Sequence, residues 1–560
     1  MAGYDQTLRP FLWRAERLYP DRELVSRTHE GIERYTYGDY AERIRQLANA
    51  LEAAGVGEGD RVGTFCWNHH RHAEVYFAAP NVGGQLHTIN PLLPPKHIQY
   101  IVENAADRLI FVDPSLLEVL EDAYDAEAFE NVEQFVVMGA AVPETDLESV
   151  VDYESFIGEH DGDYEWPELD EELPAGMCYT SGTTGEPKGV EYTQKMLWSH
   201  TMATLTPMGL GIDDSDVVMP VVPMFHVNAW GLPFSSTAAG AKHVYPGPAP
   251  DPADLAALIE EEGVTLTAGV PTVWLGLLEY IENNEVDLSS LERIVIGGSA
   301  APRSVIRRFD ELGVEVVHAW GMTETAPIGT VSHLKPDLED LPKDQQYEKR
   351  TKQGLIVPGL EFKVVDDDGE EVPWNSAERS SADRSSGQSP REDGEDFGEL
   401  LIRGPWVTDS YFKRPEADET DFEGSWLKTG DIVSVDRDGY VKIVDRAKDV
   451  IKSGGEWISS VELENTIMAH DAVAEATVVG VPHEKWQERP AAFVVPVDDA
   501  DVDRDALEAD LHETIAGEFV DWWTPDAIVF IDEVPKTATG KFDKKVLREE
   551  YADEELLADE

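Results

Sequence analysis

At residues 179–190 the chain reads Tyr179-Thr180-Ser181-Gly182-Thr183-Thr184-Gly185-Glu186-Pro187-Lys188-Gly189-Val190. Glycines let the backbone approach a ligand closely, and exposed N–H groups and hydroxyls suit the oxygens of a polyphosphate. Lys188 adds a positive charge, and the GxxxxGK[ST] spacing of a Walker A loop is absent. The stretch predicts a phosphate-binding loop that follows a strand at residues 177–179, with a flexible surface loop as the alternative.

Length and charge limit the classes of protein that this chain can represent. At 560 residues it exceeds what one hydrophobic core supports, so two or more domains are expected. Its 111 acidic and 45 basic residues give a formal net charge of -66, which argues against nucleic acid or an anionic membrane as a partner. Molar salt screens charges over roughly 3 Å. We therefore hypothesise adaptation to a very salty cytoplasm.

The cysteines and the apolar runs exclude several further classes. Cys66 and Cys178 are too few for a disulfide framework or a cysteine-rich metal site, and both lie in apolar runs typical of buried thiols. The N-terminus lacks the basic-then-apolar pattern of a signal peptide. Thr265–Ile281 comes closest to the apolar run of about 18 residues that a membrane span needs, but Gly269 and Pro271 interrupt it. A cytoplasmic protein without a membrane span is expected.

Strands and helices alternate along most of the chain, which predicts parallel βαβ units in a layered α/β architecture. The predicted strands include residues 61–67, 109–112, 134–138, 217–223, 293–296, 314–318 and 398–403. Residues 1–60 are expected to be helical and then turn-rich. We predict a large N-terminal domain over residues 1–445, with a polar low-complexity insertion at 375–396, and a small mobile C-terminal α+β domain over 446–560.

The motif at residues 224–230 carries a histidine and a tryptophan, His226 and Trp230. They are four positions apart and would share one face if the piece were helical. They could form the wall of a substrate pocket. A core histidine stacked on an aromatic ring is the alternative.

Two small-residue motifs follow predicted strands. Residues 297–302 would allow a flat ring to pack against the backbone, with a tight strand-to-helix turn as the alternative. Pro302 is expected in the first turn of the helix that follows. Residues 319–325 contain Thr323, which can donate to a phosphate, and Glu324, a hard oxygen ligand of the kind that Mg²⁺ prefers. A surface turn is the alternative there.

The C-terminal third carries three further candidates. Asp431 is a carboxylate at a predicted turn and could accept hydrogen bonds from ribose hydroxyls. Residues 445–456 are dense in charge and end in glycines, which fits either a solvated turn or a domain boundary. Lys541 lies on a short glycine-containing turn, where a lone lysine is usually only solvated.

The order of these motifs along the chain resembles the acyl-adenylate-forming superfamily, which includes acyl-CoA synthetases, luciferases and peptide-synthetase adenylation domains. The resemblance covers nearly the whole chain outside 375–396. Residues 223–230, 319–325 and 452–460 look most like those of medium- and long-chain fatty acyl-CoA ligases, a pattern that methylmercaptopropionate-CoA ligases share. An AMP-forming acyl-CoA synthetase is therefore expected, with ATP and CoA as co-substrates, Mg²⁺ as cofactor and short to medium acids as substrates.

The resemblance implies roles for particular residues. The catalytic residues would be Lys541, which bridges the attacking carboxylate and the α-phosphate, with Thr323, Glu324 and His226. The ATP and AMP site would comprise Thr180, Ser181, Gly182, Thr183, Thr184, Gly185, Lys188, Gly298, Ser299, Ala300, Ala319, Trp320, Gly321, Thr323, Asp431, Arg446 and Lys541. Thr184 and Glu324 would lie at the metal, and His226 and Trp230 in the acyl pocket. Lys448 falls at the hinge, while Gly454, Gly455, Glu456 and Trp457 would face CoA.

Two other functions fit the same scaffold. One is an adenylation enzyme that loads a carrier protein, although no carrier domain is present in the chain. The other is a catalytically silent acyl or nucleotide sensor, which the presence of Lys541, Glu324 and Asp431 together speaks against. A homodimer is common in the family and is possible here.

Overall fold

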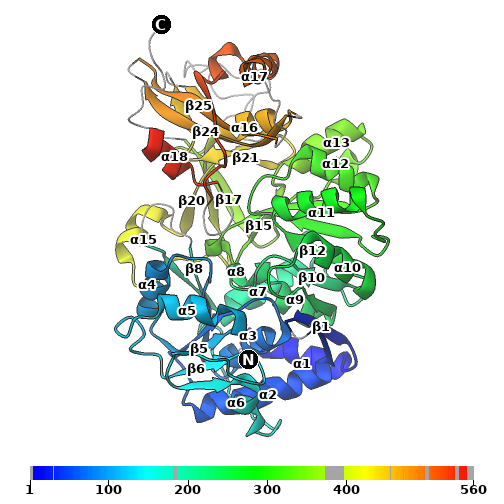
Figure 1. The fold of residues 1–560 in the computed structure, drawn as a ribbon, viewed down its shortest axis with the longest axis vertical. Coiled ribbons are helices and arrows are strands. Elements are labelled where there is room, and N and C mark those ends of the chain that lie inside the picture. The colour runs from blue at the N-terminus through cyan, green and yellow to red at the C-terminus, as the bar shows by residue number, and fades with distance from the viewer. Residues whose placement is uncertain are drawn as a thin grey trace. The chain divides into compact units, whose positions relative to one another are not determined.

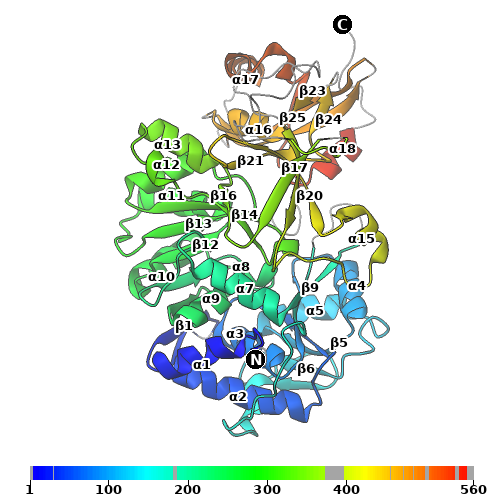
Figure 2. The ribbon, with the colours of Figure 1, turned by 180° about the vertical axis from the view of Figure 1, so that it is seen from behind.

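The computed structural model describes residues 4–29, 31–180, 186–366, 368–372, 397–453, 456–470, 472–483, 485–497, 504–536 and 542–551. The chain forms two compact units, each of which is described by itself. Unit 1 comprises Met1–Glu361 and Ile402–Leu427, and unit 2 comprises Phe362–Leu401 and Lys428–Glu560. Figures 1 and 2 label the helices and strands of both units from two sides. The predicted domain boundary at residues 445/446, which separates a small mobile C-terminal domain from the rest of the chain, stays a prediction.

One large sheet of unit 1 is parallel in its centre and antiparallel at both edges. Its strands, in spatial order, are β16 (Leu355–Ile356), β15 (Ile328–Val331), β14 (Glu315–Gly321), β13 (Arg293–Ile296), β12 (Leu266–Gly269), β10 (Val217–Pro220), β11 (Lys242–Tyr245), β1 (Glu23–Thr28) and β2 (Gly31–Thr36). The strands from β14 to β1 pair in parallel, as the alternation of strands and helices predicted. Strands β2, β15 and β16 pair antiparallel.

The second large sheet of unit 1 leads into the glycine- and threonine-rich loop. Its spatial order is β7 (Val150–Asp152), β6 (Gln134–Val137), β5 (Asp107–Val112), β3 (Arg61–Phe65), β4 (Gln85–Thr88), β8 (Pro174–Tyr179) and β9 (Gly189–Thr193). All neighbours pair in parallel except β8 and β9, which run antiparallel on either side of the loop. The predicted strand before the loop is confirmed as part of β8.

Helices follow most of these strands, and several of them carry side-chain N-caps. They are α1 (Arg9–Leu18), α2 (Tyr37–Ala53), α3 (His70–Asn81), α4 (Pro95–Ala105), α5 (Leu117–Ala123), α6 (Tyr153–Gly158), α7 (Gln194–Leu205), α8 (Val227–Trp230), α9 (Leu232–Ala239), α10 (Pro252–Glu262), α11 (Pro271–Asn283), α12 (Arg303–Glu311), α13 (Lys343–Thr351) and α15 (Pro415–Asp421). Asp251 and Asp254 form a capping box at the start of α10, and Gly263 ends that helix at φ +67°.

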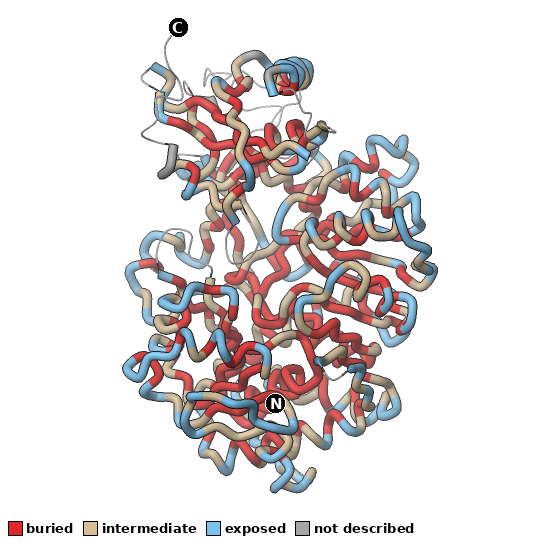
Figure 3. The backbone as a smooth tube through the Cα atoms, viewed as in Figure 1, coloured by how far each residue is buried: buried red, intermediate tan, exposed pale blue. Residues whose placement is uncertain are grey.

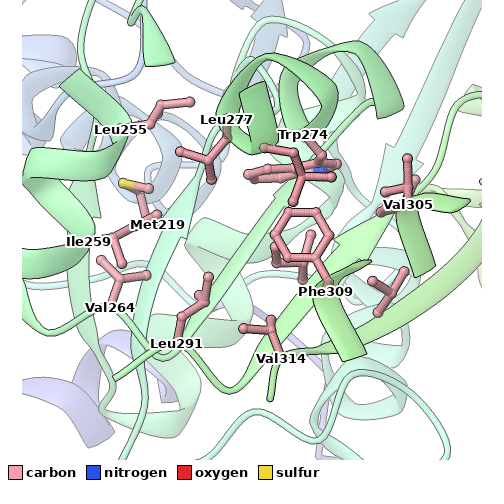
Figure 4. Packing of buried hydrophobic residues seen from close by; sticks show 14 of the residues in the cluster. Met219, Leu255, Ile259, Val264, Trp274, Leu277, Leu291, Val305, Phe309 and Val314 are labelled. Atoms are coloured by element: carbon pink, nitrogen blue, oxygen red, sulfur yellow. The ribbon is translucent and has the colours of Figure 1, made fainter. Parts of the chain in front are cut away.

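Helices α10, α11 and α12 share one hydrophobic core with the large sheet. Trp274 is fully buried and its Nε1 donates to the carbonyl oxygen of Gly269 at 3.2 Å. Figure 4 shows the ring of Phe309 beside Trp274, with aliphatic side chains of the helices and strands around them. A buried Trp needs a partner for its N–H, and here the adjoining strand supplies it. Every residue of β12 is buried, as are three of the four residues in β10 and in β13, and Figure 3 colours the backbone by this burial.

Unit 2 contains a smaller sheet with helices packed on it. Its strands are β23 (Glu456–Ile458), β22 (Ile451–Ser453), β25 (Gln487–Pro496) and β24 (Val473–His483), with β26 (Ala527–Phe530) paired to β25. The helices are α16 (Ser460–Met468), α17 (Arg504–Glu518) and α18 (Lys544–Tyr551). The unit boundaries fall within a further sheet of β17 (Glu361–Val365), β18 (Phe397–Arg403), β20 (Trp426–Val435) and β19 (Phe422–Glu423), with β21 (Val441–Arg446) on β20.

Three sequence predictions need correction. Residues 23–36 form the hairpin β1–β2 instead of helix and turn, because β1 is stabilised by parallel pairing with β11, about 220 positions later, which no local pattern shows. Asp431 lies within β20 and not at a turn, since the strand continues through Gly430 at φ +67°. Pro302 precedes α12 as its N-cap and is not in its first turn.

Within the described residues no helix is both long and apolar enough to cross a membrane. Thr265–Ile281, the closest candidate, divides between β12 and α11. Cys66 and Cys178 are buried free thiols, as the apolar runs around them predicted.

Candidate active site

The glycine- and threonine-rich loop is closed at its base by two hydrogen bonds between Thr180 and Lys188. Thr180 N donates to the carbonyl oxygen of Lys188 at 2.9 Å, and Lys188 N donates to Thr180 Oγ1 at 3.2 Å. This pairing continues the antiparallel β8–β9 ladder, so both ends of the loop are anchored to one sheet. Five of the predicted phosphate-binding residues lie outside the described residues: Ser181, Gly182, Thr183, Thr184 and Gly185.

Lys188 is held in place by two neighbours from a later part of the chain. Its Nζ forms an ion pair with Asp421 at the end of α15, and the two side chains are 35% and 27% exposed. The same Nζ lies 4.6 Å from the centre of the Tyr411 ring, a distance typical of a cation–π contact. The lysine is therefore oriented but still reachable from solvent.

Strand β14 ends in the motif that contains Thr323 and Glu324. Trp320 is 7% exposed and its ring packs on Gly329 of β15, where a Cβ would come within 2.4 Å of the ring. Residues Thr323–Thr325 form one turn of 3-10 helix, and the hydroxyl of Tyr192 donates to the carbonyl oxygen of Thr323 at 2.7 Å. The motif is thus tied to the two sheets of unit 1 and is not a loose surface turn.

Glu324 is a largely buried carboxylate, 7% exposed. The hydroxyl of Tyr411 donates to its Oε1 at 2.8 Å, and the backbone N of Thr408 donates to its carbonyl oxygen at 2.8 Å. Burial and the charge of Glu324 raise the pKa of Tyr411, so the phenol stays protonated and acts as a donor. A charge-assisted hydrogen bond of this kind fixes the orientation of the carboxylate.

The small-residue turn after β13 brings two predicted subsites together. Gly298 and Ser299 are exposed, and Gly298 has a φ of +82°, a conformation that favours glycine. A Cβ on Gly297 would lie 3.1 Å from the ring of Trp230. The indole predicted for the acyl pocket therefore lies against the segment predicted for the adenine site. The carbonyl oxygen of Ala319 lies beside Gly297 too, at 3.1 Å from the position of such a Cβ.

The short element labelled α8, which follows His226 and ends at Trp230, is not a right-handed α-helix, and this corrects the argument from the spacing of His226 and Trp230. Val227, Asn228, Ala229 and Trp230 have φ values of 45°, 54°, 48° and 57°, so they form a left-handed turn. Each such residue costs about 1–2 kcal/mol. Asn68 holds the preceding strand end, because its Nδ2 donates to the carbonyl oxygens of Pro220 and Val222 at 2.9 Å. Backbone strain of this kind is concentrated at binding sites.

Two family models match this chain. The model described as AMP-binding enzyme matches residues 12–412, and the model described as AMP-binding enzyme C-terminal domain matches residues 462–541. The chain belongs to the AMP-binding enzyme family. The resemblance to acyl-adenylate-forming enzymes is thereby confirmed.

Several known proteins are similar to this AMP-binding enzyme. A long-chain-fatty-acid–CoA ligase of Thermus thermophilus is 45% identical over 553 residues, which cover 98% of this chain and 96% of the relative. A 3-methylmercaptopropionyl-CoA ligase of Ruegeria lacuscaerulensis is 42% identical, and the match covers 96% of this chain and 96% of the relative. A medium-chain-fatty-acid–CoA ligase of Ectopseudomonas oleovorans is 40% identical, and the match covers 96% of this chain and 95% of the relative. The crystal structure of the anthranilate CoA ligase AuaEII in complex with anthranoyl-AMP matches with a TM-score of 0.83 at 27% identity and covers 97% of both chains.

Unit 2 of the AMP-binding enzyme holds the remaining predicted residues that the structure describes. Asp431 is 1% exposed and its Oδ1 lies 2.9 Å from Arg446 Nε, in a directly opposed pair of β20 and β21. Burial lowers the pKa of Lys448, which lies in the turn after β21. Glu456 and Trp457 lie in β23. Gly454, Gly455 and Lys541 lie outside the described residues.

The donor set of unit 1 fits a magnesium ion that arrives with ATP. Among the described residues no group of three histidines, cysteines or carboxylates could hold a metal alone. Mg²⁺ is commonly bound through one or two carboxylates together with substrate phosphates, and Glu324 offers such an oriented carboxylate.

Sequence reasoning missed Tyr411 and Asp421, which contact the predicted site residues Glu324 and Lys188. They lie more than 80 positions from Glu324 and more than 220 from Lys188 along the chain, so no local spacing connects them. The only available signal was the polar and aromatic run at residues 408–412.

Proposed function

We propose that this chain is an AMP-forming acyl-CoA synthetase. It joins a carboxylic acid to CoA, consumes ATP, and releases AMP and pyrophosphate through an acyl-AMP intermediate. The family match and the relatives named as CoA ligases support this proposal. The observation that carries it is the joint placement of Lys188 and Glu324 around the ring and hydroxyl of Tyr411.

The first half-reaction brings a carboxylate anion to the α-phosphate of ATP, so catalysis is mostly positioning and charge neutralisation. We propose that residues Thr180–Lys188 hold the triphosphate, that Thr323 contacts the α-phosphate, and that Asp431 with Arg446 binds the ribose. Lys541 would bridge the two anions. The adenine would lie between the turn at Gly298, Ser299 and Ala300 and the strand at Ala319, Trp320 and Gly321.

Mg²⁺ would be held by Glu324 and Thr184, where it would neutralise developing charge on the phosphates. Glu324 itself is kept in one orientation by the hydroxyl of Tyr411. His226 and Trp230 would form the wall next to the acid, at the left-handed turn.

The second half-reaction needs a thiol in place of Lys541 beside the acyl-AMP. We propose that the small C-terminal domain, residues 446–560, turns about Lys448 between the two steps, a domain-closure type of change. Gly454, Gly455, Glu456 and Trp457 would then face CoA.

Further properties belong to the same proposal. Trp230 and Met224 favour short to medium acids, because both are bulky apolar residues of the predicted pocket motif. The net charge of -66 favours function in a very salty cytoplasm. A homodimer stays a prediction.

The experiment is acid-dependent release of pyrophosphate and AMP in molar KCl with ATP, Mg²⁺ and CoA. The panel runs from acetate to palmitate and includes methylmercaptopropionate. Turnover that requires both an acid and CoA supports the synthetase and identifies the preferred chain length.

The other outcomes point to the two rival functions. Pyrophosphate release without a thioester would indicate a different acceptor, such as a carrier protein. No turnover with a folded protein would indicate a sensor. Lys541→Ala should nearly abolish adenylation and spare thiolation of preformed acyl-AMP, and a variant that adenylates normally would disprove its role.

A further inference from the structure

One segment, residues 408–421, contacts both loops of the candidate site in unit 1, and we call it the brace. Its Phe412 N donates to the carbonyl oxygen of Gly189 at 2.8 Å, directly after Lys188. Its Thr408 N donates to the carbonyl oxygen of Glu324, also at 2.8 Å. The brace therefore joins the end of the phosphate-binding loop to the metal-binding motif through backbone hydrogen bonds, which do not depend on side-chain rotamers.

Two side chains of the brace, Arg414 and Asp421, also contact the phosphate-binding loop. Arg414 Nη2 donates to Glu186 Oε2 at 2.5 Å and to the hydroxyl of Tyr100 at 2.7 Å. Asp421 pairs with Lys188. The phosphate-binding loop is thus contacted at Glu186, Lys188 and Gly189 by one continuous segment.

Tyr411 occupies the middle of the brace and contacts both charged residues at once. It is 6% exposed, its hydroxyl donates to Glu324 Oε1 at 2.8 Å, and its ring face lies 4.6 Å from Lys188 Nζ. Its own position is fixed, because its backbone N donates to Asp418 Oδ1 at 2.8 Å and its ring packs on Phe422 at 5.8 Å. A rigid side chain therefore connects a cation and an anion.

Tyr411 connects Lys188 and Glu324 through an uncharged side chain, which matters for ligand binding at these two residues. A phenol hydroxyl stabilises a carboxylate by a charge-assisted hydrogen bond without neutralising it. A ring face attracts an ammonium group without removing its charge. Glu324 keeps its negative charge for a divalent cation, and Lys188 keeps its positive charge for phosphate oxygens, at a separation that the tyrosine sets.

We propose that Tyr411 is a positioning residue that holds Glu324 and Lys188 in the arrangement that binds ATP together with its metal ion. It does not touch the reacting atoms. The proposal rests on the proposed function, because it assumes that ATP and Mg²⁺ bind at these two residues.

The test measures ATP binding with and without metal, as a readout independent of turnover. Dissociation constants of ATP are measured by calorimetry in excess Mg²⁺ and in EDTA, for the full-length protein and for Tyr411→Phe and Tyr411→Leu. Tyr411→Phe keeps the ring over Lys188 and loses the hydrogen bond to Glu324. It should weaken binding in Mg²⁺ about tenfold and leave binding in EDTA nearly unchanged. Tyr411→Leu also loses the ring and should weaken binding in EDTA as well.

Tyr347→Phe provides the matched control. The hydroxyl of Tyr347 donates to Asp310 Oδ2 at 2.9 Å, and Tyr347 is 7% exposed, so the same chemistry is removed at α13. It should leave both dissociation constants unchanged. Equal losses in Mg²⁺ and EDTA for Tyr411→Phe, or no loss, would overturn the positioning role. If the unaltered protein bound no ATP while folded, both the proposed function and this inference would fail.

Discussion

Lys188 in unit 1 and Lys544 in unit 2 both face carboxylates, but they differ in their access to water. The Lys188 side chain is 35% exposed and its partner Asp421 is 27% exposed. The Lys544 side chain is 11% exposed and lies 2.8 Å from Glu464, which is 8% exposed. Ser460 links the same lysine to Asp445, since its hydroxyl donates to Asp445 Oδ2 and accepts from Lys544 Nζ, both at 2.5 Å.

The difference shows which lysine can change partners. An ion pair near the surface contributes little, so Lys188 can exchange Asp421 for a phosphate at low cost. A buried charge without a partner is expensive, so Lys544 must keep its carboxylates. Burial alone would lower the pKa of Lys544, but Glu464 and Asp445 raise it above the usual value. We therefore propose that Lys188 binds a ligand and that Lys544 stabilises unit 2.

The largest expected effect is that of Lys544→Met. Removal of the cation leaves Glu464 and Asp445 buried without compensation, which should lower the free energy of unfolding by about 3–5 kcal/mol. Denaturant unfolding monitored by tryptophan fluorescence measures this. Lys536→Met is the control, because Lys536 pairs with Glu475 at a 43% exposed position and should cost less than about 1 kcal/mol. Equal losses in the two variants would remove the distinction between buried and exposed lysines.

Lys188→Ala should act on catalysis and not on stability. Loss of one group that stabilises charge in the transition state lowers kcat by about 100-fold or more. Acid-dependent pyrophosphate release measures the loss, and thermal unfolding should stay unchanged. Lys195→Ala is the matched control, since Lys195 pairs with Glu171 and Glu172 at 37% exposure. A fall in stability with normal adenylation would reverse the assignment of the two lysines.

Acid should destabilise unit 1 through buried neutral histidines such as His200. Burial lowers the pKa of His200 to about 3, and Ile328 N donates to its Nε2 at 3.3 Å, so that nitrogen must stay unprotonated. Because the folded protein keeps His200 neutral, its contribution to the free energy of unfolding is complete above pH 6.5, which is about the pKa of histidine in the unfolded chain. This contribution is lost as the pH falls towards the lower pKa of the folded state. Between pH 6.5 and 5 the loss from His200 should be about 2 kcal/mol.

His200→Gln tests this contribution. The variant should be less stable at pH 7, and the difference from the unaltered protein should shrink by about 2 kcal/mol on going to pH 5. Denaturant unfolding at several pH values measures it. A difference that does not depend on pH would show that His200 is not a neutral buried group.

The smallest expected effect is that of Asp421→Asn. Lys188 would no longer have to leave an ion pair, so ATP should bind slightly more tightly, by less than about fivefold. Calorimetric titration measures the change. Binding that weakens by about tenfold would mean that Asp421 holds Lys188 in the binding position. The proposal that Lys188 exchanges Asp421 for a phosphate would then be wrong.

Short strands that follow from runs of apolar residues were predicted well from the sequence. The strand at residues 293–296 and the strand at residues 177–179 are confirmed as β13 and as part of β8. The hairpin of β1 and β2 was missed, because β1 owes its place to pairing with β11. The left-handed turn at Val227–Trp230 was missed too, because four non-glycine residues adopt it only where surrounding contacts hold them.

The sequence by itself determined the family, the α/β class and the loop with Lys188, because each depends on residue types at short spacing. Only the tertiary structure decided which residues surround the charged groups. Tyr411 reaches Glu324 and Lys188 through loops that are far apart in the chain. Hydrogen bonds and burial depend on distances in space, which a linear pattern does not contain. The difference between an exchangeable Lys188 and a buried Lys544 has the same origin.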